Sequence, residues 1–378
     1  MQPKPVQQPA PYLSTTWRDT ETSAVGHLVV HDLFRGVATG GLRMRPGCTL
    51  REVEDLAYAM STKTAVFGLP AGGAKGGIDF DPKDTRSDGV LRRYLEAIRP
   101  FLEGTWVTAE DLGVSQQVLD ATFGEIGLGE SSYHAQIFRD ADPAAALRRI
   151  RAAMAESNPD GLVCENIAGY GVAQAAAATM RALGFTTEPL SMAVQGFGTI
   201  GGSTALYAQQ MGITVVAVSD LLGTVYHPDG LDIPALLATR NEYGEFDRAA
   251  LPVGCELQPR DAVLGAPVDI LVPAAISYAL TGKNHSVVQA RVVVEGANAA
   301  ATREAELELA VRDIAVVPDF VANAGGVAWS WWVLLGQDED VFGRLSHKMT
   351  EIVDRVLAPW LIDGTMPRRT GLELDTRH

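Results

Sequence analysis

Cysteine is scarce in this sequence: the 378 residues contain three, Cys48, Cys164 and Cys255. Their number is odd and their spacing is wide, so they provide neither a disulfide framework nor the ligand spacing of a zinc site. We interpret them as reduced thiols in a reducing compartment, and we expect no metal.

Long apolar runs are also missing. None approaches the roughly 20 residues that a membrane-spanning helix needs. Residues 1–13 are rich in proline and glutamine and lack the apolar core of a signal peptide. These absences predict a cytoplasmic protein without a membrane partner.

Positive charge is in short supply. Lysine and arginine total 31 against 46 aspartates and glutamates, which gives a formal net charge of −15. Such a surface repels phosphate backbones, so nucleic acid is excluded as a partner. A small anionic ligand must then be held by a few well-placed cations.

The length and the local patterns predict two α/β domains. We expect an α/β substrate domain over residues 13–150, completed by C-terminal helices in 325–370. A doubly wound Rossmann domain is expected over 160–320, with a cleft between the two domains.

Secondary-structure signals place the motifs. Thr49 and Glu52 form a capping box that predicts a helix start, and Leu345, Met349, Ile352 and Val356 fall on one stripe of a C-terminal helix. Further helices are expected at 88–103 and 143–155, and a short strand at 106–110. Buried parallel strands are expected at 191–195, 213–219, 268–273, 291–294 and 314–317.

A glycine-rich turn, G-x-G-x-x-G, follows the first of these parallel strands. Gly196 permits the turn, Gly198 lets the backbone approach a pyrophosphate, and Gly201 allows close packing of helix on strand. Asp220 ends the next strand, where a carboxylate suits the ribose hydroxyls of NAD, although NADP stays open. The predicted dinucleotide residues are Gly196, Phe197, Gly198, Thr199, Ile200, Gly201 and Asp220.

Two lysines and an aspartate are the candidate chemical groups. Lys63 falls on the apolar face of its own helix, where it is either a ligand or a snorkelling helix-end lysine. Lys75 lies inside Gly72-Gly73-Ala74-Lys75-Gly76-Gly77, so its ammonium is either exposed in a site or simply solvated. Asp111 follows a strand, and such a residue can also be a helix cap.

The order and spacing of eight motifs resemble the glutamate/leucine/phenylalanine/valine dehydrogenase family. The resemblance covers roughly residues 35–115 and 165–335. The motifs are G-G-x-R (40–43), K-x-A with P-x-G-G-x-K-G-G (63–77), A-E-D-x-G (109–113), the glycine-rich turn (196–201), V-S-D (218–220), D-I-L-V-P-A-A (269–275), E-G-A-N (295–298) and N-A-G-G-V (323–327).

The resemblance implies a role for each matching residue. Lys63 would hold the substrate α-carboxylate, Lys75 would polarise the carbonyl and activate water, and Asp111 would shuttle protons to and from the nitrogen. A lowered pKa of Lys75 beside a second cation would suit that proton chemistry. The remaining implied residues are Gly40, Gly41, Asn323, Gly326, Val327 and Ser330 at the substrate and Asn298 at the cofactor.

The sequence departs from glutamate-specific relatives of this family. Thr39 replaces a lysine that binds the distal carboxylate, and Ala168 replaces a threonine, while Ser330 is retained. The segment between Asp111 and Gly169 is about thirty residues longer and carries Arg139 and the arginines at 148, 149 and 151, which either form a solvated face or reach the site. Trp329, Trp331 and Trp332 form an aromatic cluster that suits either helix packing or a pocket.

The resemblance predicts an oxidoreductase that interconverts an L-amino acid with its 2-oxo acid and ammonia, using NAD or NADP. The departures favour an apolar or aromatic substrate of the Leu/Val/Phe/Trp type. The alternatives are a glutamate dehydrogenase with a rebuilt pocket and a catalytically silent regulatory member. We also expect a homo-oligomer.

Overall fold

The structure is a computed structural model, and it describes residues 9–186, 189–241 and 244–363. The chain divides into two units. The first contains residues up to 151 together with 331–337, and the second contains 152–330 and 338–363. Each unit has its own sheet, so each is described by itself.

The sheet of the first unit has the strand order β1-β2-β5-β3-β6, with β4 paired to β5. β1 and β2 are antiparallel, β2 and β5 are antiparallel, and β3, β4 and β6 run in parallel pairings. The strands are β1 (Leu13–Arg18), β2 (Val25–Val30), β3 (Ala38–Thr39), β4 (Leu42–Met44), β5 (Gly72–Asp79) and β6 (Trp106–Val107).

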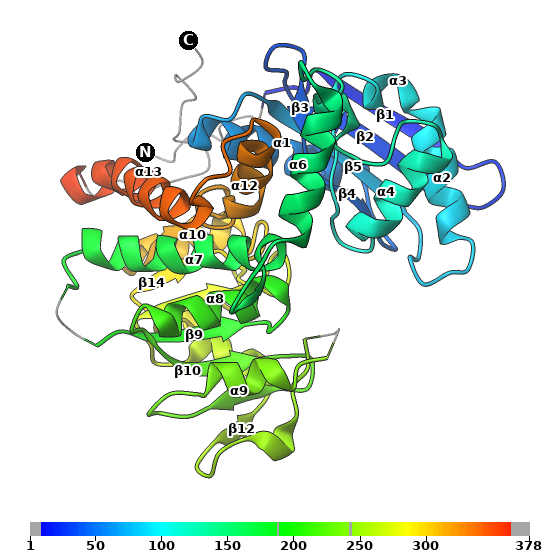
Figure 1. Cartoon of the computed structure of the whole chain (residues 1–378). Helices are drawn as coiled ribbons and strands as arrows, with labels where there is room; N and C mark the ends of the chain where they lie inside the picture. Colours follow the sequence, from blue (N-terminus) through cyan, green and yellow to red (C-terminus); the bar gives the residue numbers. More distant parts are fainter. Residues whose placement is uncertain (1–8, 187–188, 242–243, 364–378) are drawn as a thin grey trace. The chain divides into compact units, whose positions relative to one another are not determined.

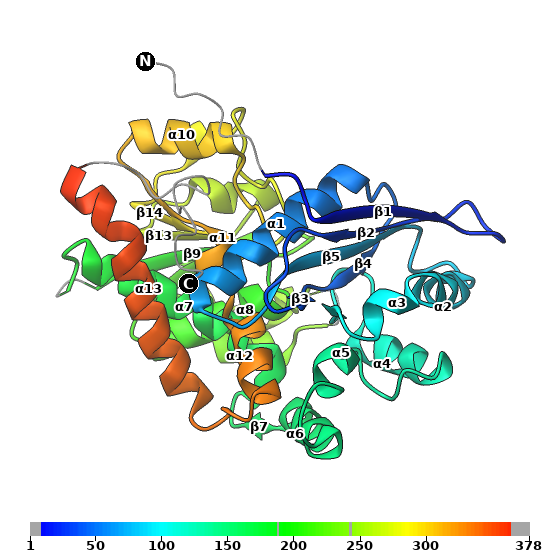
Figure 2. The same cartoon turned by 90° about the horizontal axis from the view of Figure 1, so that it is seen from above.

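Helix α1 (Leu50–Phe67) covers one face of this sheet (Figure 2). Its N-terminus is capped as expected, because the Thr49 hydroxyl accepts the Glu52 N–H at 3.2 Å. The glycine-rich run 72–77 forms the central strand β5, which the sequence did not predict. A β-carbon at Gly73 would clash with the Ser61 backbone, and one at Gly77 would lie 2.5 Å from Val53 Cγ2. These glycines therefore let α1 pack directly on β5.

The opposite face of the sheet carries the main core of the unit. Leu28 and Val30 of β2 pack there against Tyr94 and Leu95, all of them buried. The helices are α2 (Ser87–Ala97), α3 (Arg99–Leu102), α4 (Gln116–Glu125), α5 (His134–Ile137) and α6 (Pro143–Ala155), the last of which runs into the second unit. The helix expected at 88–103 is thus divided at Ile98 into two helices.

The sheet of the second unit has the order β12-β11-β10-β9-β13-β14-β15, and its last five strands are parallel. Parallel β9 (Ser191–Gln195), β10 (Thr214–Ser219), β13 (Ile270–Pro273), β14 (Val292–Val294) and β15 (Ala315–Val317) match the expected buried strands within two residues. β11 (Thr224–Tyr226) and β12 (Glu256–Gln258) extend the edge antiparallel and were not foreseen. A small hairpin joins β7 (Ser157–Asn158) and β8 (Gly161–Leu162).

Helices α7 (Val163–Ala182) and α8 (Thr199–Gln210) pack on each other beside this sheet (Figure 1). The other elements are α9 (Ile233–Ala238), α10 (Arg303–Val311), α11 (Asp319–Ala322), α12 (Gly325–Leu334), α13 (Val341–Asp363) and the short helices η1 (Arg248–Ala250), η2 (Arg260–Gly265) and η3 (His285–Val287). The stripe Leu345, Met349, Ile352 and Val356 of α13 is buried, as its spacing predicts.

The C-terminal helices divide differently from the expected arrangement. Residues 331–337 group with the first unit, but the rest of the C-terminal helical segment groups with the second. The reason is packing, since α13 lies along α7 and also contacts α11. The apolar stripe of α13 thus completes the second unit rather than the first.

Candidate active site

The first unit brings Lys75 and Asp111 together. Lys75 Nζ lies 2.6 Å from Asp111 Oδ2, and Arg43 Nε donates to the same oxygen at 2.9 Å. The side chains of Lys75, Asp111 and Arg43 are 5%, 16% and 7% exposed, so the ion pairs are largely removed from water. Lys75 is therefore not a solvated loop lysine, and Asp111 is not a helix cap.

The charges around this cluster shift its proton affinities. Burial lowers the pKa of Lys75, Asp111 opposes that shift, and the charge of Arg43 adds to it. Burial raises the pKa of Asp111, but the charges and hydrogen bonds of Lys75 and Arg43 outweigh burial and hold it well below its usual range. The neighbouring cation that helps to lower the Lys75 pKa is thus Arg43.

Arg43 links this cluster to helix α1. Its Nη1 donates to Glu52 Oε1 at 2.6 Å, and Arg45 binds the other oxygen of Glu52. Glu52 lies in the first turn of α1, so the capped helix end fixes the carboxylate that holds Arg43. The sequence assigned no role to Arg43, because the G-G-x-R motif does not show which residues the arginine contacts in the fold.

The glycines of the same motif bring backbone segments close to Asp111. A β-carbon at Gly40 would clash with the Ala74 carbonyl, and one at Gly41 would lie 2.7 Å from the Glu110 carbonyl and 3.0 Å from Asp111 Cβ. Gly113 has φ +77°, a left-handed conformation that favours glycine. Lys63, on α1, is 6% exposed, so it is not a snorkelling lysine at a helix end.

In the second unit, the glycine-rich turn has the form that the sequence predicts. Gly196 has φ +88°, and a β-carbon at Gly201 would clash with the Gly196 carbonyl. Gly198 begins α8 without any side-chain cap, and a β-carbon there would meet open space. Free N–H groups at an exposed helix N-terminus suit a pyrophosphate. The turn therefore fits a dinucleotide.

Among the buried polar atoms of the described residues that lack a hydrogen-bond partner are two side-chain oxygens close to the glycine-rich turn and to Asn298. Gln195 Oε1, immediately before the turn, accepts no hydrogen bond, and neither does Asn323 Oδ1. Asn323 is 9% exposed, and its Nδ2 donates to Gly296 O and to Asn298 Oδ1, both at 3.1 Å. Unpaired buried acceptors are costly, so a donor from a ligand at these positions would stabilise the site.

The remaining predicted residues lie in the glycine-rich turn, in α8 and in α12. Phe197 is buried in the turn, Thr199 and Ile200 begin α8, and Val327 lies in α12. Ser330 donates its hydroxyl hydrogen to the Val327 carbonyl at 3.0 Å. Ser330 is thereby hydrogen-bonded within its own helix.

Asp220 differs from expectation, because it is not a free acid. Its side chain is 1% exposed and forms an ion pair with Arg248 through both carboxylate oxygens. No sequence pattern marks this partner, which lies 28 residues further along the chain.

Among the predicted distal-pocket residues, none supplies a cation. Thr39 is buried and donates to the Val107 carbonyl at 3.0 Å, and Ala168 carries only a methyl group. Arg139 donates to the carbonyls of Arg35 and Gly104. Arg149 binds Asp140 and the Leu334 carbonyl.

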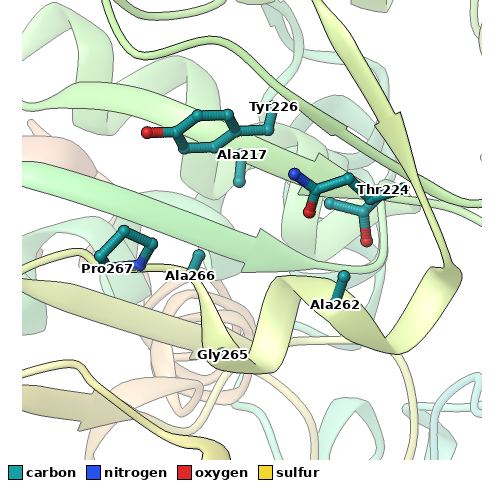
Figure 3. Close-up of a pocket in the computed structure, with 8 residues that line it drawn as sticks. Ala217, Thr224, Tyr226, Ala262, Gly265, Ala266 and Pro267 are labelled. Atoms are coloured by element: carbon teal, nitrogen blue, oxygen red, sulfur yellow. The ribbon is translucent and has the colours of Figure 1, made fainter.

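The second unit also has a pocket between β10, β11 and η2 (Figure 3). Ala217, Thr224 and Tyr226 line it from the sheet, and Gly265 and Ala266 from the other side. All of its lining residues are uncharged, and none is a predicted site residue. Within residues 9–186, 189–241 and 244–363, no group of His, Cys, Asp or Glu forms a metal site. In the same part of the chain, no helix is both long and apolar enough to span a membrane.

Family models match most of the chain. The model of the Glu/Leu/Phe/Val dehydrogenase dimerisation domain matches residues 13–127, and that of the Glutamate/Leucine/Phenylalanine/Valine dehydrogenase domain matches 162–362.

Individual proteins match over nearly the full length. The NADP(+)-dependent glutamate dehydrogenase of Pyrobaculum calidifontis is 34% identical, covering 89% of this chain and 80% of that protein. NAD-specific glutamate dehydrogenase A of Halobacterium salinarum is 32% identical, covering 91% and 78%. A Thermus thermophilus hetero-hexameric glutamate dehydrogenase, in its Leu-bound form, superposes with a TM-score of 0.77 at 30% identity, covering 97% of this chain and 88% of that one.

Proposed function

Since the chain belongs to the glutamate/leucine/phenylalanine/valine dehydrogenase family and is an NAD(P)-dependent amino-acid dehydrogenase, we propose that its substrate is an apolar or aromatic L-amino acid. The products of the oxidative direction are the 2-oxo acid and ammonia. The main observation in favour of this substrate class concerns Thr39. Its hydroxyl already donates to the Val107 carbonyl, at a position where a distal carboxylate would need a cation.

The chemistry rests on the Lys75–Asp111 pair. Lys75, with its lowered pKa, takes a proton from water as it attacks the imine carbon, and as an ammonium it stabilises the oxygen of the carbinolamine. Both cations make their closest contact with Asp111 Oδ2, so Oδ1 is the oxygen proposed to exchange protons with the substrate nitrogen. Lys63 is proposed to hold the α-carboxylate. A nicotinamide coenzyme held by the second unit would supply the chemistry of hydride transfer from Cα.

The residues of the second unit would hold the other reactant. The free N–H groups at Gly198 and Thr199 would bind the pyrophosphate. The unpaired Asn323 Oδ1 would accept from an N–H group of the substrate or of the nicotinamide amide, because both ligands carry one.

The apolar preference is supported by the absence of a counter-ion at three positions. A buried, uncompensated carboxylate costs several kcal/mol. Thr39 has its hydroxyl bonded to Val107, Ala168 has no polar atom in its side chain, and Ser330 is bonded within α12. None of the three compensates the charge of a glutamate side chain.

Glutamate is the second candidate substrate, and the names of the relatives favour it. Both curated relatives described above are glutamate dehydrogenases, and the chain spans 80% and 78% of their lengths. For glutamate to be the substrate, its distal carboxylate would need a cation from outside the three positions.

Steady-state kinetics on the twenty amino acids with NAD and with NADP separates the two candidates. We expect kcat/KM to be higher for leucine, valine, phenylalanine or tryptophan than for glutamate. The double variant Thr39→Lys/Ala168→Thr should shift activity toward glutamate, and Thr39→Val is the matched control that adds no charge. A wild-type kcat/KM for glutamate above that of every apolar amino acid would refute the apolar proposal.

We also propose that the chain assembles with copies of itself through the first unit. The family model that matches residues 13–127 is a dimerisation domain, and the matched Thermus thermophilus enzyme is hetero-hexameric. β1 is the outermost strand of that sheet and pairs with β2 alone among the described strands, so its other edge is available to a second chain.

A further inference from the structure

The carboxylate of Asp220 is fully occupied by groups of the protein itself. The N–H groups of Leu222 and Gly223 donate to Oδ1 at 2.8 and 3.2 Å, and the N–H of Phe246 donates to Oδ2 at 3.4 Å. Arg248 binds both oxygens, Nη2 to Oδ1 and Nη1 to Oδ2. A carboxylate has about four acceptor positions. In this arrangement, Asp220 has none left for a pair of ribose hydroxyls.

Arg248 is held beside the glycine-rich turn. Its guanidinium lies 4.1 Å from the centre of the Phe246 ring, and Phe246 packs edge-on against Phe197 of the turn at 5.3 Å. The Arg248 side chain is 21% exposed against 1% for Asp220. Solvent at the end of β10 therefore meets the guanidinium and not the acid.

The guanidinium retains donors for a ligand. Nη1 also donates to the Phe246 carbonyl at 3.0 Å, and the second donor of Nη2 makes a long contact of 3.4 Å with the Gly223 carbonyl. No described residue accepts from Nε. A phosphate oxygen could bind Nε–H and replace the long Gly223 contact, while the ion pair with Asp220 stays intact.

We propose that Arg248 is the residue that sets coenzyme choice, by neutralising Asp220 and offering its guanidinium to a 2′-phosphate. The acid alone would favour NAD and repel NADP. The pair instead accepts both coenzymes, since the repulsive charge is cancelled and a phosphate gains a donor. The inference deepens the proposed function, because it concerns the same enzyme's coenzyme.

Calorimetric titration of the purified protein with NAD⁺ and with NADP⁺ tests this inference without any turnover. The wild type should bind both, with Kd values within about tenfold of each other. Arg248→Met should weaken NADP⁺ binding about 10- to 100-fold, the worth of one or two hydrogen bonds to a charged group. The same variant should leave the Kd for NAD⁺ within about threefold.

Two further variants keep the result interpretable. Asp220→Asn leaves the guanidinium unpaired and should tighten NADP⁺ binding, and Asp220→Asn/Arg248→Met removes both charges, so no buried ion is stranded. Arg260→Met is the matched control, because Arg260 is exposed and pairs with Asp261. Equal weakening of both coenzymes by Arg248→Met, or unchanged NADP⁺ binding, would overturn the proposal. Because binding is measured directly, a wrong amino-acid substrate would leave this test unaffected.

Discussion

At the residue scale, the proposed chemistry rests on Lys75 and Asp111, and Lys75 shares one oxygen of Asp111 with Arg43. We expect Lys75→Ala and Asp111→Asn each to lower kcat by about 10²–10⁴-fold, the usual contribution of general acid–base catalysis. Dinucleotide binding should survive, since the coenzyme residues belong to the second unit. Stopped-flow or steady-state rates check this, and a variant that keeps more than a tenth of the wild-type kcat would refute the role.

Arg43 is expected to act as a positioning residue that also tunes its neighbours. Its charge lowers the pKa of Lys75 and that of Asp111. In oxidative deamination Lys75 must lose a proton, so kcat should rise with pH through the lowered pKa of that lysine. Arg43→Met removes the neighbouring charge, which raises the Lys75 pKa, so the rising limb of the profile should move to higher pH.

Two control variants distinguish tuning from structural damage. Arg43→Lys keeps the charge and should keep the limb near its wild-type position. Arg45→Met removes an arginine that binds Glu52 but does not contact Asp111 in the structure, so its profile should match the wild type. If the rising limb of the kcat–pH profile stays at the same pH in Arg43→Met, the proposal that Arg43 lowers the Lys75 pKa is wrong.

The residues that sequence reasoning found and missed differ in one physical respect. Lys75 lies in a glycine-rich motif and Gly201 in the G-x-G-x-x-G turn, so residues close in the sequence mark both positions. Arg248 is distant in sequence from Asp220, and its role arises from tertiary packing on Phe246. The positions of charged residues in the sequence do not show which of them pair in the fold. The Asp220 carboxylate was therefore expected to be free.

At the element scale, the glycines of β5 set how closely α1 approaches the sheet. We expect Gly73→Ala to destabilise the first unit by about 1–3 kcal/mol, because the added methyl would overlap the Ser61 backbone. A thermal melt should then show a midpoint lower by about 2–4 °C for each kcal/mol. Gly104→Ala is the control, since a β-carbon at Gly104 meets no atom within 4 Å. Equal midpoints for the two variants would contradict the packing argument.

The elements that could be predicted are those with a strong local pattern. The five parallel strands are continuous apolar runs, and α1 begins at a capping box, so both were placed within two residues. β5 was not predicted as a strand, because glycine has low strand propensity. This strand needs glycine because it pairs with β2 and β3 and because α1 packs directly on it. The sequence of one strand does not show which elements pack against it.

At the scale of the whole molecule, the described residues form one large sheet in each unit, and the edge of the first unit's sheet is proposed to join copies of the chain. The N–H of Asp19, just after β1, donates to the Ala24 carbonyl at 3.0 Å, and N–H groups alternate in direction along an antiparallel strand. The N–H of Ser14, an odd number of residues from Asp19, therefore points away from β2. A partner strand that adds to this edge would accept from it.

Ser14→Pro removes that donor while the hydrogen bonds toward β2 remain, since proline is tolerated at an edge. Light scattering after size exclusion should give the wild type a mass that is a multiple of 40.3 kDa, and the variant a smaller multiple or the single-chain mass. Ser14→Ala keeps the N–H and should keep the wild-type mass. A thermal midpoint measured in parallel shows whether the first unit stays folded. An unchanged mass in a folded Ser14→Pro variant would place the interface elsewhere than on β1, because strand addition at this edge needs the hydrogen bond that proline removes.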